Sequence, residues 1–210
     1  MAKQNNGING GYQGTVGTVV GYNWRGQWCT RARPRKVKNP KTAPQEDHRG
    51  WFTAAVRLAS YMKTALRQGL HYSSLAQHMT EGNYFIRLNR PHFGWQDGVL
   101  TVDYGSLAVA EGPVTSVHFG AVETAEAGTV SVPFDTDPAD GHSSCYDTVY
   151  LYAYCPEAKQ GVLAPPVYRP ADCVTLAKPR LWADAAMQLY GWVQDIDGRC
   201  SPSTYLGSRV

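Results

Sequence analysis

The sequence lacks the features that mark membrane proteins and exported proteins. It contains no run of about 18 apolar residues, which a membrane-spanning helix would need. The N-terminal stretch Met-Ala-Lys-Gln-Asn-Asn-Gly has no apolar core of the kind found in signal peptides. We therefore expect a protein that is made in the cytoplasm, does not insert into a membrane, and can be incorporated into a virion or an extracellular particle.

The cysteines have neither the number nor the spacing of a disulfide framework or a zinc site. Five are present, an odd number, and no Cys-x-x-Cys pair occurs. Together with the missing export signal, these features favour reduced thiols. Free cysteine usually behaves as a small apolar residue, so we expect buried, inert side chains. The positions are Cys29, Cys145, Cys155, Cys173 and Cys200.

Patterns of catalytic and metal-binding residues are missing as well. The six histidines form no His-Glu-x-x-His pair, and no Gly-x-Ser-x-Gly elbow occurs. The acidic stretch 135–140 is similar to a calcium loop but lacks the closing glutamate and contains Pro138. The glycines of residues 7–21 are followed neither by the lysine of a phosphate-binding loop nor by the helix of a dinucleotide-binding motif. We predict a protein that is not an enzyme and uses no cofactor or metal.

Positive charge is concentrated at the N-terminus. Eight lysines and arginines precede the first acidic residue, Glu46. Since the whole chain has a formal net charge of +3 and this segment carries +8, the remainder carries −5. Such asymmetry favours an acidic partner for the basic segment: nucleic acid, a membrane surface, or the acidic part of a neighbouring copy.

A glycine-rich segment opens the chain and reads as an extended hairpin rather than a helix. Glycine recurs about every third position from 7 to 21, between β-branched residues, and each internal glycine costs a helix about 1 kcal/mol. The pattern predicts strands at 15–22 and 27–33, joined across the turn residues 23–26. The glycines leave room for another backbone or an aromatic ring to lie against the strand.

A basic, proline-containing connector leads to one long amphipathic helix. Thr42 and Gln45 have the spacing of a capping box, and acidic residues follow in the first turn. Apolar residues then recur at helical spacing, which predicts a helix over about 45–68. The expected buried stripe consists of Phe52, Ala55, Val56, Ala59, Met62 and Leu66.

The C-terminal half is typical of an all-β domain. About seven short β-rich runs are separated by Asp-Gly and similar turns, and this favours a β-sandwich of immunoglobulin-like type. The overall prediction is an α+β chain, mainly β, with an arm and linker at 1–41, a helical segment at 42–92 and a β-sandwich at 93–210. The predicted strands are 99–104, 115–122, 129–134, 148–154, 173–176, 187–194 and 203–206.

Tyrosines alternate with aliphatic residues in the run 148–154. Tyr150, Tyr152 and Tyr154 share one face of the expected strand, while Val149, Leu151 and Ala153 share the other. The aliphatic face is the natural core, so we expect the tyrosines to be exposed. Exposed tyrosine rows are frequent at protein interfaces, and they also bind carbohydrate.

Four separated strings of residues occur together in this chain. They are Gly-Gly-Tyr-Gln-Gly-Thr-Val-Gly-Thr-Val-Val-Gly at 10–21, Asn-Pro-Lys-Thr-x-x-Gln-x-x-x-Arg-x-x-Phe at 39–52, Asn-x-Phe-Ile-x-x-Asn at 83–89 and Ser-x-Ser-x-Tyr at 201–205. The combination resembles an uncharacterised family of gut-type bacteria that is known only as a domain of unknown function, and it covers essentially the full chain. Strings similar to the second occur in phage-related structural proteins, which implies a structural role without any activity.

These observations lead to one main functional hypothesis and two alternatives. The main one is a self-associating or partner-bound structural subunit of a phage-like or other repetitive particle, in which the glycine-rich hairpin extends a neighbour's sheet. The alternatives are a nucleic-acid-binding protein that uses residues 31–41, and a carbohydrate- or surface-binding module. Arg49 is expected to anchor carbonyl groups of the arm or of a neighbouring subunit. The expected assembly interface comprises Gly14, Val16, Gly17, Val19, Val20, Gly21, Trp24, Trp28 and Arg49. The expected contacts with nucleic acid or an acidic partner are Arg31, Arg33, Arg35, Lys36, Lys38 and Lys41.

Overall fold

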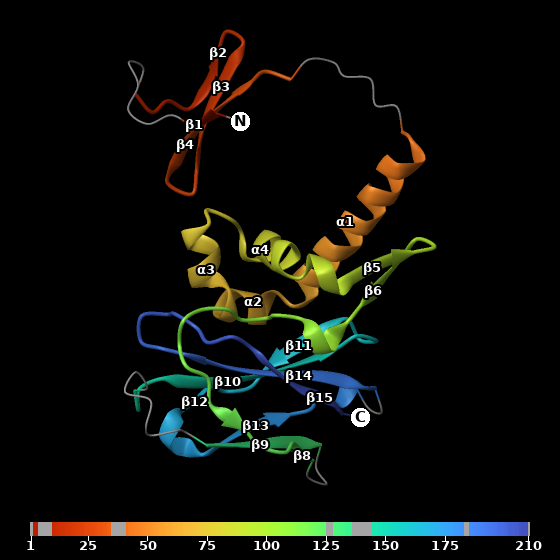
Figure 1. Cartoon of the computed structure of the whole chain (residues 1–210), viewed down its shortest axis with the longest axis vertical. Helices are drawn as coiled ribbons and strands as arrows, with labels where there is room; N and C mark the ends of the chain where they lie inside the picture. Colours follow the sequence, from red (N-terminus) through yellow and green to blue (C-terminus); the bar gives the residue numbers. More distant parts are fainter. Residues whose placement is uncertain are drawn as a thin grey trace.

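The computed structural model describes residues 2–3, 10–34, 41–124, 128–135, 144–182 and 185–209. The chain is a mixed α/β protein with more strand than helix and several separate sheets. Along its longest axis follow the N-terminal sheet, a layer of helices and two further sheets (Figure 1). Residues 2–3 and 10–34 are called the arm below, and the described residues from 41 onward are called the body.

The arm is a four-stranded antiparallel sheet with the strand order β1-β4-β3-β2. The predicted hairpin is confirmed, because β3 and β4 are joined by Arg25 and Gly26, whose φ angles of 49° and 81° are those of a type I′ turn. The single strand predicted over 15–22 is wrong, because the chain reverses at Gly17, where φ is 59°. The strands are β1 (Ala2–Lys3), β2 (Gly14–Val16), β3 (Val19–Trp24) and β4 (Gln27–Ala32).

Two glycines of the arm make room for aromatic rings, as the sequence predicts. A side chain at Gly21 would overlap the ring and the backbone of Tyr12. A side chain at Gly11 would overlap the indole of Trp28. The arm thus packs rings directly on backbone, which takes the place of interdigitating side chains.

The predicted long helix is two helices with a bend between them. Met62 has φ −90° and ψ 7° and is fully buried, so the chain changes direction where its side chain enters the core. The predicted capping box is wrong, because the side chain of Thr42 accepts no capping hydrogen bond. Instead, the backbone carbonyl of Thr42 accepts hydrogen bonds from the backbone N–H groups of Gln45 and Glu46. Two shorter helices complete the layer. The four are α1 (Ala43–Tyr61), α2 (Lys63–Gly69), α3 (His71–Ala76) and α4 (Glu81–Leu88).

The buried face of α1 differs from the predicted stripe by about one residue. Trp51 and Leu58 are buried, whereas Phe52 and Val56 are 44% and 41% exposed. The reason lies in tertiary packing, since the indole of Trp51 packs against Phe93 in the strand that follows the helices. The positions of the stripe that are buried as predicted are Ala55, Ala59, Met62 and Leu66.

The body contains two larger sheets and one hairpin. In the first sheet the order is β11-β10-β14-β15, with β12 also paired to β10, and in the second it is β13-β9-β7, with β8 also paired to β9. The hairpin β5–β6 runs beside the helices (Figure 1). The bounds are β5 (Phe93–Gln96), β6 (Val99–Val102), β7 (His118–Phe119), β8 (Glu123–Thr124), β9 (Thr129–Asp135), β10 (Thr148–Cys155), β11 (Gln160–Leu163), β12 (Val167–Tyr168), β13 (Cys173–Ala177), β14 (Met187–Gln194) and β15 (Thr204–Arg209). Short 3₁₀ turns are η1 (Arg90–His92), η2 (Tyr104–Ser106), η3 (Arg169–Ala171) and η4 (Arg180–Trp182).

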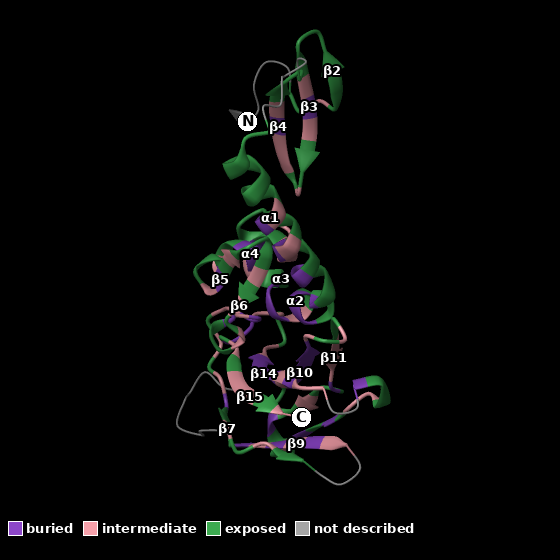
Figure 2. Ribbon diagram, turned by 90° about the vertical axis from the view of Figure 1, so that its right-hand side faces the viewer, coloured by how far each residue is buried: buried purple, intermediate pink, exposed green. Residues whose placement is uncertain are grey.

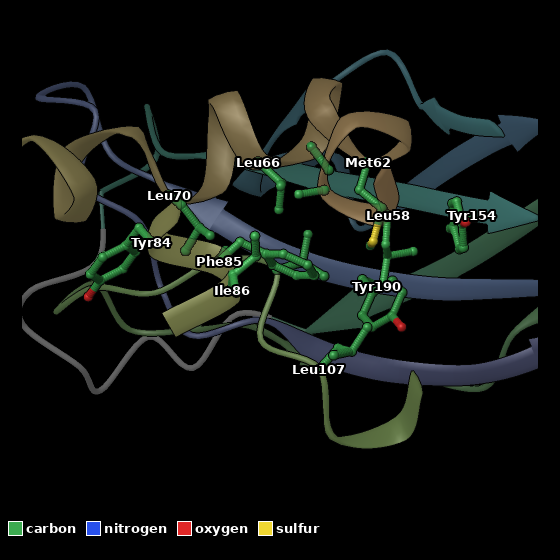
Figure 3. Close-up of a cluster of buried hydrophobic side chains, with 14 of the residues drawn as sticks. Leu58, Met62, Leu66, Leu70, Tyr84, Phe85, Ile86, Leu107, Tyr154 and Tyr190 are labelled. Carbon is green, nitrogen blue, oxygen red and sulfur yellow. The ribbon is translucent and has the colours of Figure 1, made fainter. Parts of the chain in front are cut away.

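The first sheet is buried on both faces, which corrects the predicted exposure of the tyrosine row. Val149, Leu151 and Ala153 form a core with the second sheet, as expected. Tyr152 and Tyr154, however, are 0% and 2% exposed, because the helices cover their face. Figure 3 shows Tyr154 and Tyr190 among Leu58, Met62 and other helical side chains. An exposed tyrosine row was the argument for carbohydrate binding, and that argument no longer stands.

The thiols largely follow the prediction. All five cysteines are free, and Cys29, Cys155 and Cys200 are buried. Burial raises the pKa of Cys200 to about 12, which keeps its thiol protonated and unreactive at neutral pH. Cys145 is exposed and Cys173 half-buried, contrary to expectation.

Most of the acidic stretch compared with a calcium loop, residues 136–140, lies outside the described residues.

Candidate interaction site at the N-terminal arm

The arm has almost no interior. Within residues 10–34, only Gly21 and Cys29 are buried. Figure 2 shows the contrast between this exposed sheet and the buried strands of the body. A small sheet without a covered apolar face is marginally stable by itself, so its stability depends on what it contacts.

One edge of the arm is a strand that carries no charged residue and no proline. Strand β2 ends the order of the sheet, so the described residues pair with only one of its two edges. All three of its residues are exposed, and Val16 is 66% exposed. Natural edge strands are usually protected by a charge, a proline, a bulge or a very short length, and Gly14-Thr15-Val16 has neither charge nor proline but is only 3 residues long. Val19, which pairs with Val16, is 38% exposed and widens the apolar area.

The tip of the β3–β4 hairpin contacts the body at the corner between α3 and α4. The indole Nε1 of Trp24 donates a hydrogen bond of 2.9 Å to the carbonyl of His78. The guanidinium of Arg25 donates to the carbonyl of Met79, and its Nη2 lies 3.6 Å from Oε2 of Glu81. These three contacts are polar and small, so they orient the arm without burying much apolar surface.

Glu81 is the acidic residue that receives the tip. Besides the ion pair with Arg25, its Oε1 lies 2.7 Å from Nδ1 of His71. Partial burial acts to raise the pKa of Glu81, but the hydrogen bond with His71 and the charge of Arg25 outweigh it, so the pKa is lowered. The carboxylate is therefore ionised at neutral pH, where it pairs with Arg25 and lies within hydrogen-bond distance of His71.

The residues predicted for an assembly interface fall into two groups. Eight of them lie together in the arm sheet, between Gly14 and Trp28. Arg49 lies on α1 of the body, where it is exposed and has an interaction of its own. Arg25, which makes the ion pair to the body, was not among the predicted residues. The available signal was its place in the two-residue turn of the predicted hairpin, because turn side chains project farthest from a sheet.

Part of the predicted basic contact surface can be placed. Arg31 and Arg33 are exposed at the end of β4 and just beyond it, and Lys41 is exposed just before α1. Among the described residues, none of these three forms an ion pair with a carboxylate. Arg35, Lys36 and Lys38 lie outside the described residues.

The sequence matches a family of unknown function, DUF6266, over residues 11–207. The chain belongs to this family. The match confirms the resemblance to an uncharacterised domain family and includes the arm together with nearly all of the body. No curated protein matches this DUF6266 chain.

Among solved structures, the DUF6266 chain is similar to a crystal structure of domains from titin. The TM-score is 0.33 and the identity is 12%, over 49% of this chain and 32% of that chain.

In the part of the chain that the structure describes, no helix is long and apolar enough to cross a membrane.

Proposed function

We propose that this DUF6266 chain is a non-enzymatic assembly subunit whose N-terminal arm pairs with a neighbouring copy in a repetitive, phage-like particle. The observation that carries the proposal is the arm itself: a sheet without a core, with an open and uncharged edge strand, that projects away from the body (Figure 1). An edge of this kind readily accepts a strand from another chain.

The energetics favour a covered arm. Val16 and Val19 together present an apolar strip beside backbone groups of β2 that pair with none of the described residues. Pairing with a strand of a second copy would satisfy those groups and remove the valine side chains from water. Each copy has the same edge, so pairing of one β2 with another is self-complementary and is compatible with two-fold symmetry.

Charge adds a second attraction between copies. Arg31 and Arg33 are exposed at the base of the arm, and the chain beyond the basic segment carries −5. Arms and bodies of neighbouring copies therefore attract each other at long range, and salt weakens this attraction.

We further propose that the two sheets of the body form an immunoglobulin-like sandwich. The orders β7-β9-β13 and β11-β10-β14-β15 correspond to strands A-B-E of one sheet and C′-C-F-G of the other. The two sheets also share one apolar core, as a sandwich requires. This assignment describes the scaffold and does not by itself indicate a function.

The assembly proposal is tested by size-exclusion chromatography with light scattering on the full-length protein, over a range of concentrations and salt. We expect concentration-dependent oligomers. Val16→Lys should weaken association by about tenfold or more, because a charge blocks the edge. Val99→Lys is the matched control, since Val99 is also a valine in a hairpin strand and is 62% exposed.

Removing residues 1–40 gives an independent variant, which should be monomeric. A full-length protein that stays monomeric at high concentration in every salt would refute the proposal. Equal weakening by Val16→Lys and Val99→Lys would show that association does not use the edge of β2.

A second candidate function is nucleic-acid binding through the base of the arm. The specific observation is that Arg31 and Arg33 are exposed and have no carboxylate partner among the described residues. Binding through phosphate contacts would fall linearly with salt on logarithmic axes, and Arg31→Ala with Arg33→Ala would reduce the slope by about 2. Absence of any retention of DNA or RNA at low salt would eliminate this function.

A further inference from the structure

A cleft in the helical layer lies away from the arm and is not used in the assembly proposal. It is bordered by the first half of α1, the end of α4, η1 and β5. The labelled elements α1, α4 and β5 lie next to one another in Figure 1. Its volume is about 620 Å³, within the range of small-molecule binding sites. The lining residues are His48, Trp51, Arg87, Arg90, Pro91, Phe93 and Trp95.

The charged groups of the cleft are two arginine guanidinium groups. Arg87 and Arg90 supply them, His48 adds an imidazole, and the described lining residues include no carboxylate or carboxamide side chain. Among the described residues, neither arginine forms an ion pair with a carboxylate. Three other arginines of the chain do have such partners: Arg25, Arg169 and Arg199. Two arginines without a carboxylate in one cleft leave an uncompensated positive field at that place.

Stacking and hydrogen bonding hold these side chains in position. The guanidinium of Arg90 lies over the indole of Trp51 at 4.7 Å, and the ring of His48 stacks on the same indole at 5.8 Å. Arg87 lies over the ring of Tyr84 at 5.2 Å, and its Nη1 and Nη2 each donate a hydrogen bond of 3.4 Å to Oε1 of Gln77. A guanidinium that is ordered by stacking loses less conformational entropy when it binds an anion.

The cleft also offers a flat apolar wall. Trp95 is half-buried and packs against α1 at Gly50, where any side chain would overlap the indole. Phe93 lies behind it and contacts both Trp51 and Phe85. The indole of Trp95 is therefore fixed in orientation beside the two arginines, and a flat ring can stack on such a surface.

We infer that this cleft binds a nucleotide unit, with its phosphate between Arg87 and Arg90 and its base against the wall formed by Trp95. The two guanidinium groups only donate hydrogen bonds, so they favour a ligand whose charged end only accepts them, and phosphate meets that requirement. A neutral sugar carries no charge, so its hydrogen bonds to the guanidinium groups would be weaker. The unit can come from a free nucleotide or from a single strand of nucleic acid, in which bases stack on aromatic side chains in the same way.

The test is titration of the full-length protein with adenosine monophosphate, a ten-nucleotide oligothymidine, inorganic phosphate and glucose, followed by tryptophan fluorescence and calorimetry. We expect adenosine monophosphate to bind, to bind more tightly than inorganic phosphate, and to quench fluorescence. Arg87→Gln and Arg90→Gln should each weaken binding about tenfold or more, because each removes a charge-assisted hydrogen bond. Arg57→Gln is the control, since Arg57 is exposed on α1 but does not line the cleft.

The two sources of the unit are separated by the oligothymidine arm of the test. The cleft is assigned to single strands if oligothymidine binds more tightly than adenosine monophosphate. This binding must be lost in Arg90→Gln but retained when Arg31 and Arg33 are replaced by alanine. Weaker or equal binding assigns it to free nucleotides. The inference is overturned if adenosine monophosphate does not bind, if Arg57→Gln weakens it as much as the cleft variants do, or if phosphate or glucose binds equally well. These results do not depend on the oligomeric state, so failure here leaves the assembly proposal intact.

Discussion

The arm and the central sheet of the body are both antiparallel, yet they are stabilised in opposite ways. Strand β10 has helices on one face and a second sheet on the other, and six of its eight residues, Val149 and Leu151 to Cys155, are buried. All three residues of strand β2 are exposed. Strand pairing alone therefore does not decide whether a strand belongs to a core or to the surface. What distinguishes them is whether the side-chain faces are covered within the same chain.

The largest expected effect concerns the two arginine–carboxylate pairs, one in each region. Arg169 and Asp147 are 3% and 4% exposed, whereas Arg25 and Glu81 are 24% and 21% exposed. Asp147→Ala leaves a buried guanidinium without its partner and should lower the free energy of unfolding by about 3–5 kcal/mol. Glu81→Gln should cost about 1 kcal/mol or less. Urea denaturation measures both, and similar losses in the two variants would contradict the comparison.

A similar contrast is expected for apolar side chains. Leu151 is fully buried between the two sheets, so Leu151→Ala should cost about 2–5 kcal/mol by leaving a cavity. Val16 is 66% exposed in the arm, so Val16→Ala should change the stability of the monomer by less than about 0.5 kcal/mol. Denaturation at a concentration low enough to dissociate oligomers checks the pair. A large effect of Val16→Ala on the monomer would show that the arm has a core within its own chain.

The smallest effect is a release of the arm in acid. The pKa of Glu81 is lowered by His71 and Arg25 despite the opposing effect of burial, so the docked state gains stability above the ordinary pKa of the carboxyl group. That gain should disappear as the pH falls through the lowered pKa, where protonation removes the ion pair. The protection of the β3–β4 amides against hydrogen exchange, expressed relative to an unfolded chain at the same pH, should therefore fall as the pH drops below the ordinary pKa of the carboxyl group. Glu81→Gln should show the lower protection already at neutral pH, and an unchanged pH profile of protection in this variant would contradict the role of Glu81.

Local sequence signals predicted those elements whose geometry depends on near neighbours. The Arg25-Gly26 turn requires two residues with positive φ, and a two-residue turn fixes the register of the two strands that it joins. Strands β9, β10, β13 and β14 were also predicted within about two residues, because β-rich runs between turn residues are local features. The turn at Gly17 was missed because a glycine in a glycine-rich strand gives no separate signal.

The candidate sites were predicted less completely, because they depend on residues that are distant in the sequence. Trp24 was predicted as an interface residue, but its partner His78 lies 54 positions away. The cleft joins His48 and Trp51 of α1 to Arg90 and Trp95, and no spacing rule connects these positions. Helical periodicity placed Phe52 rather than Trp51 in the core. The spacing of apolar residues along α1 does not indicate that Phe93, which is distant in the sequence, packs against the indole of Trp51.

By itself, the sequence determined an exposed glycine-rich hairpin, an amphipathic helical segment and a strand-rich C-terminal half. Backbone preferences and the alternation of side chains act over a few residues, and those determinants are complete in the local sequence. Only the tertiary structure decided that the tyrosine face of β10 is buried under the helices, and that the arm contacts the body at Glu81. Alternation shows that a strand has two different faces, but whether the second face meets water or another layer depends on where distant segments pack.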